Sequence, residues 1–156
     1  MSDVLIVAAR RSPLTTRGRA LAKVSADRLA APVLRAAADD AARAMGAPIE
    51  VADVVLGNCR GPGGNTARLA ALAAGFGVRT PGATLDRQCG SGLAAVIEAA
   101  KAIAAGDERP RLAGGVESAS TAPERRIDGI PFERAPFAPT GWPDPGMIDA
   151  ADALAR

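Results

Sequence analysis

The amino-acid sequence predicts an α/β fold with a mostly parallel, layered sheet. Short apolar runs alternate with longer segments in which apolar residues recur at helical spacing, the pattern of successive βαβ units. With 156 residues, 48% of them hydrophobic and 23% charged, the chain has the size and composition of one soluble globular domain. Only 3% of the residues are aromatic and none is tyrosine. We therefore expect a core of small side chains between closely approaching backbones.

The first strand and the first helix are expected near the start of the chain. Residues 4–9 form a short apolar run that predicts a central strand buried on both faces. Residues 25–45 follow with helical spacing, a serine suited to cap the start, and Gly46 suited to end the helix. Pro32 lies deep in this segment, where it removes a backbone hydrogen bond and clashes with the preceding turn. We therefore expect either a later helix start or a kink near Arg28.

Strands and helices continue to alternate after this first helix. Glycine or proline bounds most segments, and parallel strands joined in this way require right-handed crossovers. In the longest later helix, Leu93, Val96 and Ile97 are expected on one side and Glu98 and Lys101 on the other. The segments are a strand at 51–57, a helix at 66–74, a strand at 83–85, a helix at 92–105 and a strand at 111–116.

The composition changes after residue 120. Six of the 12 prolines and three of the four aromatic residues fall between residues 122 and 146, which predicts a proline-stiffened, irregular segment that is partly detached or disordered. Helical spacing resumes at residues 147–156. We therefore expect a core at 1–121, a proline-rich segment at 122–146, and the start of a truncated helix at 147–156.

Composition also excludes several classes of function. The absence of histidine removes the commonest general base and metal ligand from this chain. The two cysteines, Cys59 and Cys89, are too few for a disulfide scaffold or a zinc site, so no metal is expected. A net charge of +2 with few aromatics argues against nucleic acid. Without a signal peptide or an apolar stretch of roughly 18 residues, we expect a cytoplasmic protein outside the membrane.

Cys89 is the residue best placed for chemistry. It lies at the predicted turn from the strand at 83–85 into the helix at 92–105, where unpaired amides and the helix dipole favour a thiolate. Gly90 and Gly92 allow a sharp turn and a close approach of the backbone to a ligand. The alternative is a buried structural cysteine. Cys59, by contrast, is expected to be a passive residue at the end of a strand.

Several ordered motifs resemble the N-terminal half of the thiolase family, which includes acetyl-CoA acetyltransferases and 3-ketoacyl-CoA thiolases. The resemblance implies a thiolase-like layered α/β fold with a mixed sheet and a buried helix that begins at Cys89. The motifs are CGSGL at 89–93 and GGVESAS at 114–120, supported by LGN at 56–58, NTAR at 65–68 and AARRSP at 8–13.

What the resemblance implies about function is Claisen-type chemistry on coenzyme A thioesters. Cys89 would attack an acyl thioester, hold the acyl group, and donate its backbone N–H to the developing oxyanion. The substrate would be a coenzyme A thioester, and no covalently bound cofactor is expected. Supporting residues would be Gly90, Ser91, Gly92, Gly114 and Gly115, whereas Glu117 is expected to be structural. Arg125, Arg126 and Arg134 would bind a coenzyme phosphate or, alternatively, be solvated surface charges.

The sequence also departs from the family. Family enzymes are much longer, and their second half supplies a histidine, a second cysteine and part of both oxyanion holes. We therefore expect this chain to be inactive alone, either as a truncated thiolase, which its uncapped end favours, or as one subunit of a split thiolase whose partner chain carries those residues. A noncatalytic thiolase-fold interaction module is a third alternative. Uncovered apolar surface predicts association, and the resemblance implies a homo-oligomer, either a dimer or a tetramer.

Overall fold

The structure, a computed structural model, describes residues 3–156, and the chain divides into two compact units, Met1–Pro123 and Glu124–Arg156. In the first unit, three parallel strands form one sheet in the order β2-β1-β3. The strands are β1 (Asp53–Gly57), β2 (Gly82–Leu85) and β3 (Arg111–Gly115). This arrangement confirms the predicted α/β class.

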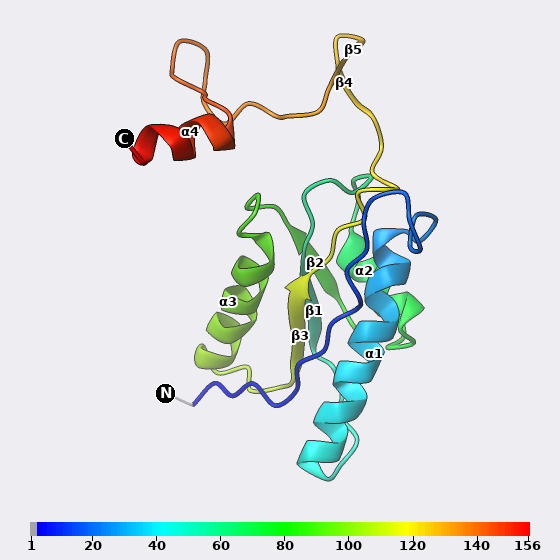
Figure 1. Ribbon diagram of the computed structural model, residues 1–156. Helices are drawn as coiled ribbons and strands as arrows, with labels where there is room; N and C mark the ends of the chain where they lie inside the picture. Colours follow the sequence, from blue (N-terminus) through cyan, green and yellow to red (C-terminus); the bar gives the residue numbers. More distant parts are fainter. Residues whose placement is uncertain (1–2) are drawn as a thin grey trace. The chain divides into compact units, whose positions relative to one another are not determined.

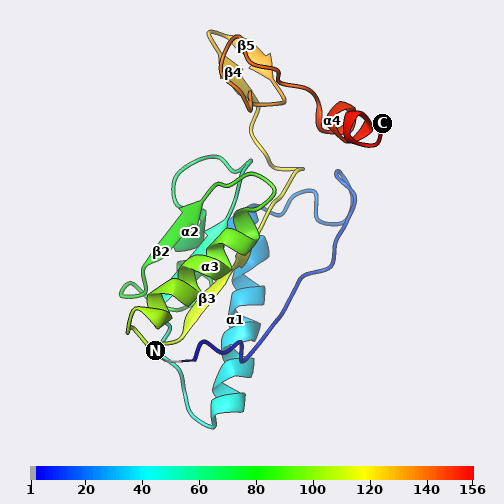
Figure 2. The same cartoon turned by 90° about the vertical axis from the view of Figure 1, so that its left-hand side faces the viewer.

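Helices cover both faces of this sheet and give the unit three layers (Figure 1 and Figure 2). α3 (Ser91–Ala104) packs against β1 and β3 on one face, while α1 (Ala26–Met45) and α2 (Thr66–Ala73) lie on the other. The side chain of Asn65 caps α2 by accepting the N–H of Arg68 at 3.0 Å. Each of these helices and strands agrees with its predicted bounds to within two residues.

Pro32 lies inside α1 without delaying its start. The helix begins at Ala26, so of the two expectations the later start is wrong, and the kink near Arg28 stays a prediction. Pro32 has no N–H to donate to the Arg28 carbonyl. Both residues are exposed, so water can hydrogen-bond to that carbonyl instead. Gly46, with φ of 67°, ends the helix in the left-handed conformation.

The predicted strand at residues 4–9 is wrong. These residues pair with no strand among residues 3–156, and Leu5 and Ile6 are 74% and 81% exposed. An apolar run forms a strand only where a neighbouring strand takes up its backbone hydrogen bonds. No described strand does so here, because the sheet ends at β2 and β3. The central strand is therefore β1, and the sheet is parallel rather than mixed.

The expectation of a buried helix at Cys89 is also wrong in part, because one side of α3 is open. Leu93 is 67% exposed, Val96 36% and Ile97 40%. Small side chains can approach the glycine-containing strands closely, and the larger ones therefore lie on the outer side. The buried side of α3 consists of Ser91, Ala94, Ala95 and Ala99.

The core between α1, α2 and the sheet is rich in alanine, as the composition predicts. Val54 in β1 is completely buried, and Leu34 of α1 and Leu56 of β1 are 7% and 3% exposed. Alanine lets the helices approach closely, so a compact core forms from small volumes. The alanines of this core are Ala30, Ala31, Ala38, Ala67, Ala70, Ala71 and Ala74.

The second unit contains a short antiparallel hairpin and a helix. The hairpin pairs β4 (Arg125–Ile127) with β5 (Ile130–Phe132), and α4 (Met147–Leu154) forms where helical spacing resumes. Asp128 and Gly129, with φ of 51° and 80°, make the two-residue turn of the hairpin. Among residues 3–156, none of the helices combines the length and the apolar composition that a membrane crossing requires.

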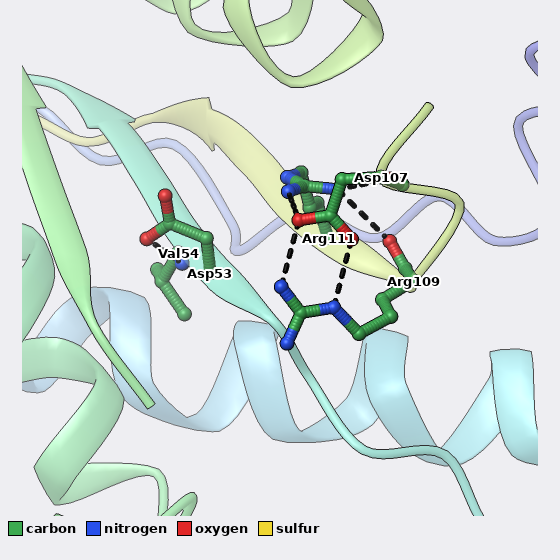
Figure 3. A network of polar contacts seen from close by, with 5 residues as sticks. All are labelled: Asp53, Val54, Asp107, Arg109 and Arg111. Atoms are coloured by element: carbon green, nitrogen blue, oxygen red, sulfur yellow. Dashed lines mark hydrogen bonds and ion pairs between the residues drawn. The ribbon is translucent and has the colours of Figure 1, made fainter. Parts of the chain in front are cut away.

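Asp107, just before β3, binds two arginines (Figure 3). Arg109 donates to both of its carboxylate oxygens at 2.7 Å, and Arg111 donates to the carboxylate and, at 2.6 Å, to the Asp107 backbone carbonyl. Nearby, Asp53 accepts the N–H of Val54 at 2.8 Å. The hydrogen bonds from Arg109 and then Arg111 hold the pKa of Asp107 well below its ordinary value. This network ties the turn after α3 to the first residue of β3.

Replacing this carboxylate gives a pH-dependent test of the network. Because the folded-state pKa of Asp107 is depressed, its contribution to stability is complete above the unfolded pKa of about 3.9 and is lost as pH falls toward the folded value. We expect Asp107→Asn to lower the melting temperature at pH 7 by about 1 to 3 °C, because solvent screens the ion pairs, with the difference from the natural chain narrowing at pH 3. Circular dichroism melts measure this, and Asp152→Asn on exposed α4 serves as the control. A difference that does not depend on pH would contradict the role of the charge.

Candidate active site

Three loops meet at the carboxyl edge of the sheet. Gly57, the last residue of β1, pairs with Leu85 at the end of β2 and Gly115 at the end of β3. The loops at 58–65, 86–90 and 116–123 leave from these three ends. Cys89 lies on the second loop, next to the N-terminus of α3. In open α/β sheets this edge is the usual place for ligands.

Glycines let α3 approach the strand ends at backbone distance. A Cβ atom added at Gly57 would lie 2.6 Å from the Gly92 nitrogen and from the Ser91 Cβ. One added at Gly115 would lie 3.1 Å from the Gly92 Cα, whereas one added at Gly114 would meet nothing within 4 Å. The close approach to α3 therefore involves Gly115 and not Gly114.

The turn that carries Cys89 is closed by local hydrogen bonds. Asp86 accepts the N–H of Gln88 at 2.8 Å, and Arg87 accepts the N–H of Gly90 at 3.0 Å. The buried Ser91 hydroxyl accepts the N–H of Arg87 at 2.7 Å and donates to the Gln88 carbonyl at 2.6 Å.

α3 begins at Ser91 with Gly90 as its N-cap, so the predicted start at Cys89 is two residues too early. Gly90 has no side chain, and the first amides of the helix therefore receive no side-chain cap. Cys89 immediately precedes this uncapped end and is exposed. The positive end of the helix dipole thus lies beside an accessible thiol.

Glu117 connects the loop after β1 to the loop after β3. Its carboxylate accepts the backbone N–H of Cys59 at 2.9 Å and that of Arg60 at 3.2 Å. It also accepts the side-chain amide of Asn58 at 2.9 Å, and that amide donates to the Val116 carbonyl as well. These contacts give Glu117 the hydrogen-bonding surroundings of a structural residue.

The sequence did not predict the contacts that Cys59 makes with the turn that carries Cys89. The Cys59 sulfur lies 3.0 Å from the Gln88 carbonyl oxygen and 3.2 Å from the Ser91 hydroxyl. The sequence offers one weak signal for these contacts, namely that Cys59 follows a predicted strand and so had to lie at the same sheet edge as Cys89. Cys59 therefore contacts the turn that carries Cys89.

The three arginines considered for a coenzyme phosphate lie in the second unit. Arg125 is half-buried in β4, Arg126 pairs with Glu124, and Arg134 pairs with Asp144. The guanidinium of Arg134 also stacks over the Phe137 ring at 5.2 Å. Arg126 and Arg134 are therefore already paired with carboxylates.

The model of the thiolase N-terminal domain matches residues 4–137. This chain belongs to the thiolase family and corresponds to the N-terminal part of its members.

Curated relatives agree with this assignment. The chain is 40% identical over 166 aligned positions to the VraB protein of Staphylococcus haemolyticus, and 39% identical over 165 to that of Staphylococcus aureus; both are assigned by name to the acetyl-CoA C-acetyltransferases. Each alignment covers 100% of this chain and 42% of the relative. The chain thus spans less than half the length of the curated relatives that it matches.

Solved structures show the same relationship. An acetyl-CoA acetyltransferase from Bacillus anthracis is 43% identical, with a TM-score of 0.68 over 78% of this chain and 31% of the other. The Acat5 thiolase of Ascaris suum, solved with coenzyme A, is 28% identical, with a TM-score of 0.73 over 92% of this chain and 36% of the other.

A methyl group at Gly57 tests the close contact between the strand ends and α3. Because the added Cβ would overlap backbone atoms that cannot rotate away, we expect Gly57→Ala to cost about 1 to 3 kcal/mol. Gly114→Ala is the matched control, since its Cβ enters open space and should leave stability unchanged or slightly raised. Urea denaturation of both variants measures the difference. Equal midpoints for the two variants would show that the contact does not constrain the fold.

Proposed function

We propose that this chain supplies the nucleophile of a thiolase-type acyl transfer, with Cys89 accepting the acyl group of a coenzyme A thioester. The observation that carries the proposal is the placement of an exposed Cys89 directly before the uncapped start of α3, at the carboxyl edge of the sheet. Membership of the thiolase family supports the same role.

The first chemical stage needs a thiolate and a place for negative charge. The Cys89 thiolate attacks the thioester carbonyl carbon, a new carbon–sulfur bond forms, and the carbon–sulfur bond to coenzyme A breaks. The departing coenzyme A thiolate then takes up a proton. A cysteine reacts through its thiolate, which is so strong a nucleophile that a small ionised fraction is enough for reaction. The N–H of Cys89, together with the amides at the start of α3, stabilises the negative oxygen of the tetrahedral intermediate.

The second stage needs groups that this sequence lacks. Transfer of the acyl group to the carbanion of a second thioester requires a base, and there is no histidine among the 156 residues. In this proposal, the base and a second cysteine lie outside this sequence, and the chain alone stops at the acylated Cys89. The exposed Leu93, Val96 and Ile97 of α3 support association of this unit with a further body.

Site-resolved acylation tests the proposal. The chain is incubated with excess acetyl-CoA, digested with trypsin, and mapped by mass spectrometry, where Arg60 and Arg87 place the two cysteines on separate peptides. We expect acetylation at Cys89 about tenfold faster than at Cys59, because only Cys89 is exposed beside a helix N-terminus.

Two controls make the acylation experiment decisive. Cys89→Ser removes the expected modified peptide, and the urea-unfolded chain shows the rate of a cysteine without its fold. Acetylation of Cys89 at the rate seen in urea would contradict the proposed function.

A further inference from the structure

The residue before Cys89 has an unusual backbone conformation. Gln88 has φ of 51°, in the left-handed region that residues other than glycine, asparagine and aspartate rarely adopt. Such a conformation is costly and persists only where surrounding contacts hold it in place. The contacts on Gln88 therefore decide how the following Cys89 is presented.

Three donors converge on the Gln88 carbonyl oxygen. Ser91 provides two of them, its hydroxyl at 2.6 Å and its backbone N–H at 3.0 Å. Both belong to the first residue of α3 and are local to the turn. The third is the Cys59 thiol at 3.0 Å, which comes from 29 residues earlier in the chain. Cys59 thus ties this turn to the loop after β1.

The arrangement of hydrogens makes Cys59 the donor. The single hydrogen of the Ser91 hydroxyl is directed to Gln88 at 2.6 Å, and its oxygen already accepts from Arg87. The Gln88 carbonyl oxygen can only accept, so in its 3.0 Å contact with Cys59 the S–H is the donor. Burial raises the pKa of the Cys59 thiol, and the Asp86 and Glu117 carboxylates raise it further against an opposing effect of Ser91. The thiol therefore stays protonated at neutral pH and can donate.

The backbone of Cys59 is itself fixed. Its N–H donates to Glu117 at 2.9 Å, and the neighbouring Asn58 and Arg60 bind the same carboxylate. A thiol on an anchored backbone can hold Gln88 in one place, whereas a thiol on a mobile loop could not.

We propose that Cys59 is a positioning residue for Cys89, and that its S–H donates to the Gln88 carbonyl and stabilises the left-handed turn before the nucleophile. This inference rests on the proposed function of Cys89. It assigns a role to the thiol that the sequence had suggested was passive.

The test compares donor and non-donor side chains at position 59. The initial rate of Cys89 alkylation by iodoacetamide is measured at neutral pH in the natural chain and in Cys59→Ser, Cys59→Ala and Cys59→Val, with peptide mapping to isolate Cys89. Serine restores a donor, while alanine and valine lack one and bracket the volume of cysteine. Losing one hydrogen bond predicts alkylation about 3- to 10-fold slower in the alanine and valine variants, with serine within about twofold of the natural chain.

Each outcome decides the proposal. Equal rates in all four proteins would overturn it, and so would equal slowing by serine, alanine and valine, which would indicate packing rather than donation. Melting curves confirm that the compared variants are folded, and serine, closest in shape to cysteine, keeps the comparison available if a larger change unfolds the chain. Alkylation does not require acyl transfer, so failure of acetylation with acetyl-CoA would count against the proposed function and leave this comparison intact.

Discussion

The backbone contact between the strand ends and the first turn of α3 is the constraint on which the candidate site depends. Gly57 and Gly115 have no side chains at the point where Ser91 and Gly92 come closest to the sheet. Any Cβ at Gly57 would push the start of α3 away from the sheet, and the turn that carries Cys89 would move with it. The position of the Cys89 thiol therefore depends on the missing side chains of Gly57 and Gly115 as well as on the contacts of the turn that carries it.

Polar contacts then organise the loops that this backbone contact brings together. Glu117 holds the backbone of the loop after β1, and Ser91 closes the turn after β2. Cys59 links the first of these loops to the second. Side-chain networks of this kind fix the orientation of a reactive group more firmly than a single hydrogen bond would. Asp107 and its two arginines lie at the N-terminal end of β3, away from the site.

Local signals predicted most elements, and their failures have physical causes. Gly46 and the glycines flanking α3 act through their own backbone, so the sequence alone locates these helix ends. The strand expected at 4–9 rests on composition, but a strand also needs a neighbouring strand to pair with, and that neighbour comes from a distant part of the chain.

The sequence analysis does not predict the hairpin of β4 and β5. Asp128 and Gly129 are a strong two-residue turn signal, but the many prolines of this segment favour an irregular structure instead. The role of Cys59 depends on a contact across 29 positions, which spacing along one chain does not reveal.

The error on α3 arises because this helix has apolar residues both on the side that faces the sheet and on part of its outer side. A pattern of large apolar residues predicts which side is buried only when one side alone is buried. In α3 the sheet selects alanines and Ser91, because the glycine-lined contact excludes larger side chains, and leucine, valine and isoleucine are left on the outer side. Large exposed apolar residues that gather on one helix are typical of a surface that packs against another body. On α3 these residues are Leu93, Val96 and Ile97, so the outer side of the helix is the apolar surface that the sheet leaves uncovered.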